Sequence, residues 1–150
     1  LYWPVRREQR GGDSLELMVC LDEKNGMLFH GRRQSRDRRV LEDMYSSFSQ
    51  RVLSIRPFSA SLFAEHYPGR VCVDSLLLTH AKPGDLCFVE DLLLKPWEDQ
   101  IRRLFVYRWN RRYPGDFFFD LDLSANWRKV YTVDFPGYSH QKLTKEIYSR

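Results

Sequence analysis

The feature that most constrains the fold is the run LELMVCL at residues 15–21, which is almost entirely apolar. A strand with one solvated face alternates apolar and polar residues, so a continuous apolar run is typical of a strand covered on both faces. Further short strands are expected at 52–55, 71–74 and 86–89, each bounded by turn residues. Strands of this kind belong to a mainly parallel sheet.

Helical segments are expected between these strands. After Ser35, a predicted N-cap, and Asp37 in the first turn, apolar residues recur at helical spacing at Val40, Leu41, Met44, Tyr45 and Phe48. A short helix is predicted from Ser59 to 66, and another begins at Pro96. Strands that alternate with helices and precede a β-rich end predict an α/β three-layer sandwich. Its mixed, mainly parallel sheet has right-handed crossovers and a C-terminal antiparallel hairpin.

The length and composition fit one domain. The chain has 150 residues, of which 43% are apolar, enough for a single core. We expect the domain to span 15–150 and to follow an N-terminal arm, 1–14, with a hinge at Gly11-Gly12-Asp13. No apolar run approaches the roughly 18 residues of a membrane span, so no membrane association is expected.

The three cysteines, Cys20, Cys72 and Cys87, lie within apolar runs. Their number is odd and no CxxC spacing occurs, which predicts buried thiols in a reducing compartment rather than disulfides or a metal site. Because the first residues also lack the apolar core of a secretory signal, we expect a cytoplasmic protein.

The C-terminal third leaves two assignments open. The segment LFVYRW at 104–109 suits either a helix that continues to Arg112 or a strand, and the tail from Ser139 suits either a strand or a helix. FFFDLDL and WRKVYTVDF are predicted to pair as a hairpin with Asp120 and Asp122 on its solvated face. The tryptophans Trp97, Trp109 and Trp127 are expected in the core.

The chain is mildly basic, with a net charge of +4. Its arginines cluster in RREQR, GRRQSRDRR and RRLFVYRWNRR, but carboxylates interrupt most of the basic segments. This pattern favours a phosphate- or carboxylate-bearing partner and supports nucleic-acid binding only weakly, because a dedicated nucleic-acid binder carries a denser basic stripe.

Several of these stretches resemble dihydrofolate reductases. LMVCLDEKNGMLFHG is similar to that family's opening strand and following loop, and the stretch from Pro96 to Phe135 is similar to its C-terminal half. That half includes the turn Gly115-Asp116-Phe117-Phe118 and Trp127 at the start of the next strand. The resemblance implies a dihydrofolate reductase-like fold over almost the whole chain. It also implies a strand at LFVYRW and a final strand in the tail.

One departure from that family bears on the cofactor. Paired glycines in the family let backbone approach the pyrophosphate of a dinucleotide, whereas this chain has Phe88-Val89-Glu90-Asp91 at the matching place. Bulky acidic side chains there disfavour NADPH. We therefore expect the fold without nicotinamide chemistry. An NADPH-dependent reductase with an altered phosphate loop is one alternative function.

The chain is also similar, over nearly its full length, to small uncharacterised bacterial proteins, some of which are labelled ribonuclease Z. The matching stretches are VCLDEKNGMLF, GRRQSRDR, CFVE, YRWNRRYPGDFFFDLDLS and SHQKLTKEIY. Ribonuclease Z itself uses a HxHxDH zinc motif. This chain has four isolated histidines, His30, His66, His80 and His140, so no zinc is expected.

Two clusters are candidates for a ligand site. Basic residues surround the start of the first predicted helix, where free N–H groups attract anions, and two acids follow a central strand at the same expected cleft. The predicted site is Arg32, Arg33, Arg36, Asp37, Glu90 and Asp91. We predict that it binds a small anionic ligand or a partner.

Two other patterns bear on catalysis. Asp120 and Asp122, two apart on a predicted strand, are able to hold Mg²⁺ for a metal-dependent ribonuclease if a third acid and a basic clamp join them. Ser139 and His140 are adjacent, and neighbouring positions seldom place a nucleophile and its base correctly. We interpret that pair as a cap or a polar loop pair.

Overall fold

The computed structural model of the chain describes residues 15–48, 51–64 and 69–150. The predicted N-terminal arm, 1–14, and the predicted end of the second helix near residue 66 lie outside these ranges.

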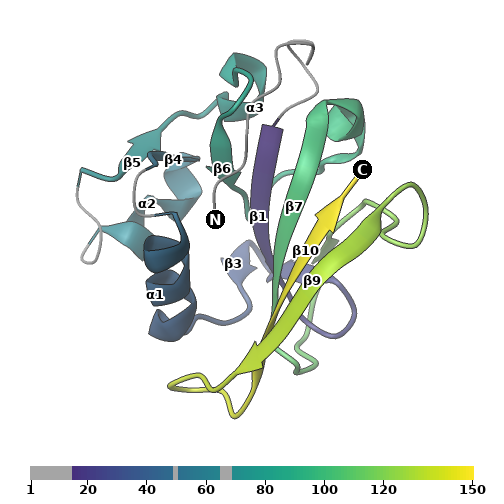
Figure 1. The fold of residues 1–150 in the computed structure, drawn as a ribbon. Helices are drawn as coiled ribbons and strands as arrows, with labels where there is room; N and C mark the ends of the chain where they lie inside the picture. Colours follow the sequence, from purple (N-terminus) through teal and green to yellow (C-terminus); the bar gives the residue numbers. More distant parts are fainter. Residues whose placement is uncertain (1–14, 49–50, 65–68) are drawn as a thin grey trace.

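A seven-stranded sheet forms the centre of the molecule (Figure 1). Its strands lie in the order β5 (Val71–Val73), β4 (Leu53–Ile55), β6 (Leu86–Phe88), β1 (Leu15–Leu21), β7 (Ile101–Arg108), β10 (Leu143–Ser149) and β9 (Arg128–Phe135). The first five are parallel, whereas β10 is antiparallel to both of its neighbours. The predicted mixed, mainly parallel sheet with a C-terminal antiparallel hairpin is confirmed.

Helices and irregular segments cover the two faces of this sheet. Leu17 and Val19 of β1 belong to one core, and Met18 belongs to the other. Helices α1 (Arg38–Ser47) and α2 (Ala60–Phe63), the latter preceded by the 3-10 turn η1 (Pro57–Ser59), pack on the Met18 side. The opposite side carries α3 (Leu77–His80), the 3-10 helix η2 (Lys95–Gln100) and residues from 117–127. Because both faces are covered, β1 is apolar at nearly every position.

A small three-stranded ribbon flanks the sheet. It has the order β3 (Arg32–Arg33), β2 (Gly26–Phe29), β8 (Phe117–Phe118). Asn25, with a φ of 62°, supplies the turn from β1 into β2. The ribbon leads into the segment before α1, which carries most of the predicted basic cluster.

The predicted helix at the basic cluster is confirmed, but its cap is different. Asp37, not Ser35, is the N-cap, and its side chain accepts a hydrogen bond from the Arg39 N–H. Val40, Leu41 and Met44 are buried as the spacing predicts. Ser35 lies two residues before the N-cap, so its hydroxyl is available for other contacts.

The strand predicted at FFFDLDL is wrong beyond Phe118. Phe119 and Leu121 are buried as the alternation suggests, but the backbone from 119 to 127 forms no strand. The Asp120 carboxylate instead accepts the N–H groups of Leu94 and Lys95. The C-terminal hairpin is formed by β9 and β10, not by FFFDLDL and β9.

Both open assignments at the C-terminal end resolve as strands. LFVYR lies in β7 and the tail forms β10, as the family resemblance implies. Trp109 and Trp127 are buried, and Trp97 packs against the core while partly exposed. No helix in the part of the chain that the structure describes is long and apolar enough to cross a membrane.

The cysteines differ in environment. Cys87 is buried, and burial raises the pKa of its thiol to about 12. Cys20 is partly buried, but Cys72 is exposed because β5 is an edge strand. The prediction of three buried thiols is therefore wrong at Cys72.

We predict that Leu17→Ala lowers the free energy of unfolding by about 2–5 kcal/mol, because this fully buried side chain lies in the central strand and its loss leaves a cavity. Leu93→Ala, at a half-exposed position, is the matched control and should change stability by less than about 0.5 kcal/mol. Urea denaturation measures both. Equal losses would contradict the assignment of β1 to the middle of two cores.

Candidate functional site

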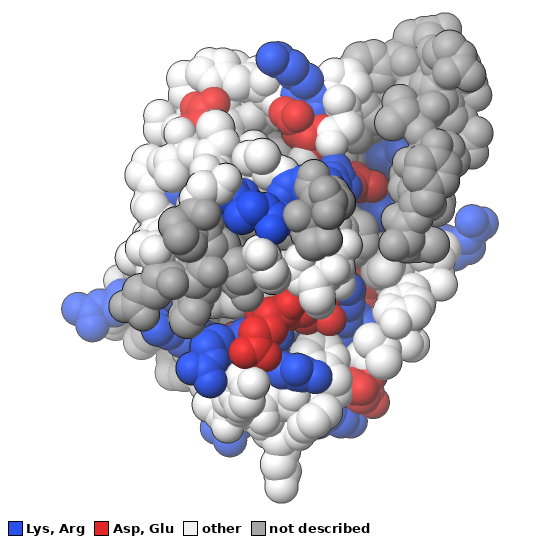
Figure 2. Space-filling view, turned by 60° about the vertical axis from the view of Figure 1, so that its left-hand side comes forward, with Lys and Arg blue, Asp and Glu red and all other residues white. Residues whose placement is uncertain are grey.

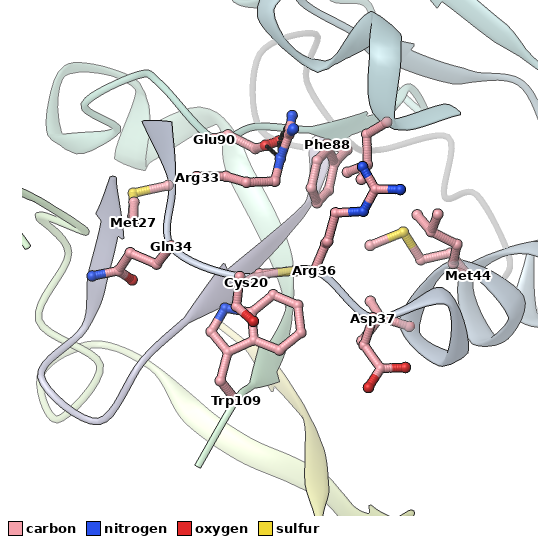
Figure 3. Close-up of a pocket in the computed structure, with 14 residues that line it drawn as sticks. Cys20, Met27, Arg33, Gln34, Arg36, Asp37, Met44, Phe88, Glu90 and Trp109 are labelled. Atoms are coloured by element: carbon pink, nitrogen blue, oxygen red, sulfur yellow. Dashed lines mark hydrogen bonds and ion pairs between the residues drawn. The ribbon is translucent and has the colours of Figure 1, made fainter. Parts of the chain in front are cut away.

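A pocket opens where the start of α1 meets the carboxyl ends of β1 and β6 (Figure 3). Its cavity volume is about 30 Å³, and it is partly open to solvent. The walls are mainly apolar, with polar groups from the segment before α1 and from the end of β6. Carboxyl ends of parallel strands are the usual place for ligands in open α/β sheets.

The two acids at the end of β6 are held by arginines. Glu90, with a side chain only 7% exposed, receives both Arg33 Nε at 2.9 Å and Arg33 Nη2 at 2.9 Å. Burial raises the pKa of Glu90, and the Arg33 guanidinium opposes that rise. Asp91 pairs with Arg56 at 3.0 Å. Because each acid is paired with an arginine, the expected charge repulsion of a pyrophosphate is weakened. The paired side chains still fill the space at the end of β6.

Arg36 differs from Arg33. Its side chain lines the pocket and is exposed, and it forms no ion pair with any residue in the described ranges. In Figure 3 it extends from the segment before α1, on the side away from Trp109. The pocket therefore has one guanidinium available to a ligand.

The structure brings together four of the six predicted site residues. Arg33, Arg36, Asp37 and Glu90 line the pocket. Asp91 faces Arg56 instead, and Arg32 is an exposed residue of β3 outside the lining.

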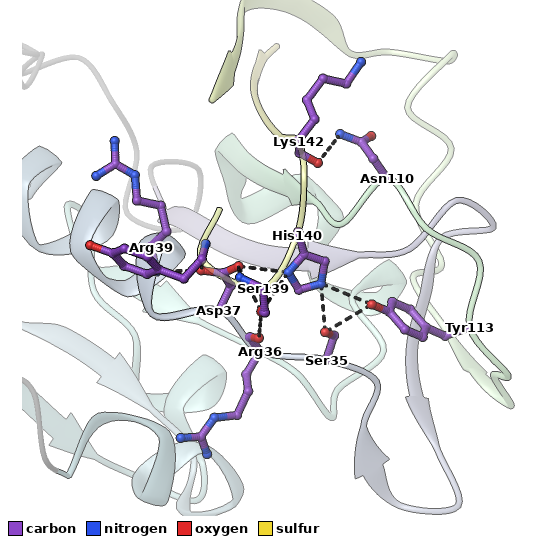
Figure 4. Close-up of polar contacts among 10 residues, drawn as sticks. Ser35, Arg36, Asp37, Arg39, Asn110, Tyr113, Ser139, His140 and Lys142 are labelled. Atoms are coloured by element: carbon purple, nitrogen blue, oxygen red, sulfur yellow. Dashed lines mark hydrogen bonds and ion pairs between the residues drawn. The ribbon is translucent and has the colours of Figure 1, made fainter. Parts of the chain in front are cut away.

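Asp37 is buried and its carboxylate is fully engaged (Figure 4). It accepts hydrogen bonds from the N–H groups of Arg39, Tyr138 and Ser139 at 2.9–3.1 Å, and His140 Nδ1 lies 2.9 Å from Oδ2. Burial alone would raise the pKa of Asp37. The hydrogen bonds from His140 and the backbone outweigh burial and hold the pKa well below its usual value.

His140 links Asp37 to the pocket. The ring is buried, stacks on Trp109 with centroids 4.9 Å apart, and places Nε2 3.0 Å from Ser35 Oγ and 3.1 Å from the Tyr113 hydroxyl. Ser139 lies on the other side of the ring, 3.2 Å from Nδ1. The prediction that Ser139 and His140 form a polar loop pair missed Ser35 and Asp37, which lie more than 100 positions away.

The two acids of the alternative metal site point to backbone groups. Asp120 accepts the N–H groups of Leu94 and Lys95, and Asp122 accepts the N–H and hydroxyl of Ser124. Among the described residues, no three His, Cys, Asp or Glu side chains gather in a metal-binding group. These acids therefore lack the third carboxylate that the metal hypothesis requires.

Comparisons with known proteins identify the fold. No family model matches the chain, and no curated protein matches it. Among solved structures, it is similar to dihydrofolate reductase from Enterococcus faecalis complexed with NADP(H) and RAB-propyl. The TM-score is 0.65 and the identity is 15%, over 91% of this chain and 96% of that one. The chain thus has the dihydrofolate reductase fold, as predicted, at an identity that shows fold alone.

We predict a pH-dependent loss of stability in Asp37→Asn. A carboxyl whose pKa is lowered by folding stabilises the native state above its unfolded pKa of about 3.9, and that contribution is lost as the pH falls below it. The variant should be less stable by about 2 kcal/mol at pH 7, and the difference should shrink toward pH 2.

Urea denaturation between pH 2 and pH 7 measures this difference. Asp99→Asn, at a fully exposed side chain, is the control and should follow the wild type at every pH. A gap between Asp37→Asn and the wild type that stays constant over the whole range would refute the role given to the carboxylate.

Proposed function

We propose that this protein binds a small anionic molecule, a carboxylate or phosphate with an apolar body, in the pocket at the start of α1. The observation that carries the proposal is Arg36, an exposed guanidinium at the pocket without an ion-pair partner among the described residues. Guanidinium groups bind carboxylates and phosphates through paired, charge-assisted hydrogen bonds.

The walls of the pocket suit the apolar part of such a ligand. Met27 and Met44 supply flexible thioether side chains, and Phe88 and Trp109 supply aromatic surface. Pockets for small molecules combine such walls with a few polar groups that fix the orientation of the ligand. The other charged groups of the lining are already paired, since Glu90 holds Arg33 and Asp37 holds His140.

The proposal disfavours a nicotinamide nucleotide as the ligand. The similar dihydrofolate reductase is complexed with NADP(H), but in this chain the end of β6 is occupied by Glu90 and Asp91, which Arg33 and Arg56 hold in place. Close approach of a pyrophosphate to backbone needs small residues there. The alternative is a reductase with an altered phosphate loop. A titration with nicotinamide nucleotide distinguishes this reductase from a protein that only binds a small anion.

The charge distribution supports a small ligand rather than nucleic acid. Figure 2 shows Lys and Arg interspersed with Asp and Glu on the face that it presents, without a continuous basic stripe. A metal-dependent ribonuclease, the other alternative function, would also need a metal-binding group beyond Asp120 and Asp122. We therefore favour a small-ligand site in the pocket over nucleic-acid binding on the charged surface.

We predict that aryl carboxylates such as benzoate raise the melting temperature by several degrees, whereas the matching neutral amides do not, since a ligand at 100 times its Kd adds about 2.7 kcal/mol. Arg36→Gln should abolish the shift. Arg32→Gln removes the same charge four residues away, outside the pocket, and should retain it. Differential scanning fluorimetry at matched ionic strength measures all three proteins.

The nucleotide control uses NADPH and NADP⁺ in the same assay and should give no shift. Equal shifts with carboxylates and amides, or an unchanged response in Arg36→Gln, would contradict the anion site. A melting shift with NADPH that grows in Glu90→Gly would instead favour the reductase alternative.

A further inference from the structure

We propose that Ser35 is a nucleophile, that His140 is its general base, and that Asp37 positions His140. In this proposal the pocket hydrolyses a small ester through an acyl-serine intermediate. The nature of the substrate, an ester of an anionic acid, rests on the proposed function. The proposed reactivity of Ser35 is independent of that function.

The three side chains form a continuous relay (Figure 4). Asp37 Oδ2 lies 2.9 Å from His140 Nδ1, and His140 Nε2 lies 3.0 Å from Ser35 Oγ. Both distances are in the range required between a nucleophile, its base and the group that orients the base. The order Asp, Nδ1, Nε2, Ser is the arrangement by which a serine triad is recognised, independent of fold and sequence position.

The surroundings fix the tautomer of His140. Asp37 is buried and accepts three backbone N–H groups in addition to the imidazole, so its carboxylate is held as an acceptor and Nδ1 carries the hydrogen. Nε2 is then free to accept a proton. Stacking on Trp109 holds the plane of the ring.

Of the two serines that lie beside His140 in the described part of the chain, Ser35 is the one placed to react. Ser35 contacts Nε2 and lines the pocket. Ser139 contacts Nδ1, the nitrogen already committed to Asp37, and is not part of the pocket lining. The Tyr113 hydroxyl lies 3.3 Å from Ser35 Oγ and 3.1 Å from Nε2, so it contacts both members of the proposed pair.

The reaction balances without a cofactor. Ser35 Oγ bonds to the acyl carbon while its proton passes to His140 Nε2. The bond from that carbon to the leaving oxygen then breaks, and the alcohol takes the proton from Nε2. Water attacks the acyl carbon in the second half, gives a proton to His140, and releases the acid as Ser35 regains its hydrogen. The net change is ester plus water to acid plus alcohol.

Two groups of Arg36 serve different purposes in this scheme. We assign its backbone N–H, on the residue after the nucleophile, to the oxyanion, which is the position used at a nucleophile elbow. The N–H makes no hydrogen bond to any residue that the structure describes. The Arg36 guanidinium holds the anionic group of the substrate.

The test is covalent labelling with a neutral fluorophosphonate, followed by intact mass and peptide mapping. The expected result is one adduct, on Ser35, formed as fluoride leaves phosphorus. Ser35→Ala should lose the adduct, and His140→Gln should slow labelling at least 100-fold. Ser61→Ala, the matched control at an exposed serine outside the pocket lining, should label as the wild type does. No adduct on the wild type, or an adduct that persists in Ser35→Ala, would overturn the proposal.

Two further variants separate reactivity from folding and position. Ser35→Cys should react with iodoacetamide faster than the native cysteines do. This result would show that a substitution at position 35 leaves the site folded, so that the loss of labelling in Ser35→Ala reports the loss of the nucleophile. Asp37→Asn should slow labelling and shift its pH profile, because the imidazole is no longer held in one tautomer. A purely structural Asp37 would change stability and leave the labelling profile of the folded fraction unchanged.

Substrate class is tested by comparing p-nitrophenyl benzoate with the mono-p-nitrophenyl ester of terephthalate, whose carboxylate cannot reach its own ester. Arg36→Gln should lower the hydrolysis rate of the anionic ester at least 10-fold more than that of the neutral ester. If Ser35 is labelled but Arg36→Gln slows the hydrolysis of both esters equally, the proposed anion site is wrong and the proposed nucleophile is supported. If aryl carboxylates raise the melting temperature but Ser35 is not labelled, the proposed nucleophile is wrong and the proposed binding site is supported.

Discussion

The Asp37 carboxylate is the interaction on which the site depends. It caps α1, accepts the backbone N–H groups of Tyr138 and Ser139, and bonds to His140. These groups come from the first helix and from the loop between the last two strands. Gly137 shows how closely the two meet, because a Cβ there would lie 2.5 Å from Asp37 Oδ2. A single buried acid therefore joins two distant parts of the chain at the pocket edge.

Much of the fold could be predicted because β1 is buried on both faces. A continuous apolar run at 15–21 has few alternatives, and the helical spacing of Val40, Leu41 and Met44 is equally restrictive. The 117–127 region was mispredicted because alternate burial of Phe119 and Leu121 looks the same in a strand and in an extended segment. The two differ only in whether the backbone N–H and C=O groups bond to a neighbouring strand, and a sequence does not show those hydrogen bonds.

The site was predictable in part for the same reason. Residues close in sequence, such as Arg33 and Arg36, were placed together correctly, and the acid that ends β6 was placed at the same cleft. The contact between Asp37 and His140 spans 103 positions, and nothing near His140 in the sequence marks it as buried. The chain has the dihydrofolate reductase fold, and a fold does not by itself determine function.

The most direct test of the central claim is a double-mutant cycle between Asp37→Asn and His140→Gln, read as unfolding free energies at pH 7. If the carboxylate and imidazole form the buried contact that organises the site, the coupling energy should be about 1–3 kcal/mol. Losses that add to within about 0.3 kcal/mol would mean that the two residues act independently, and the account of the site would be wrong.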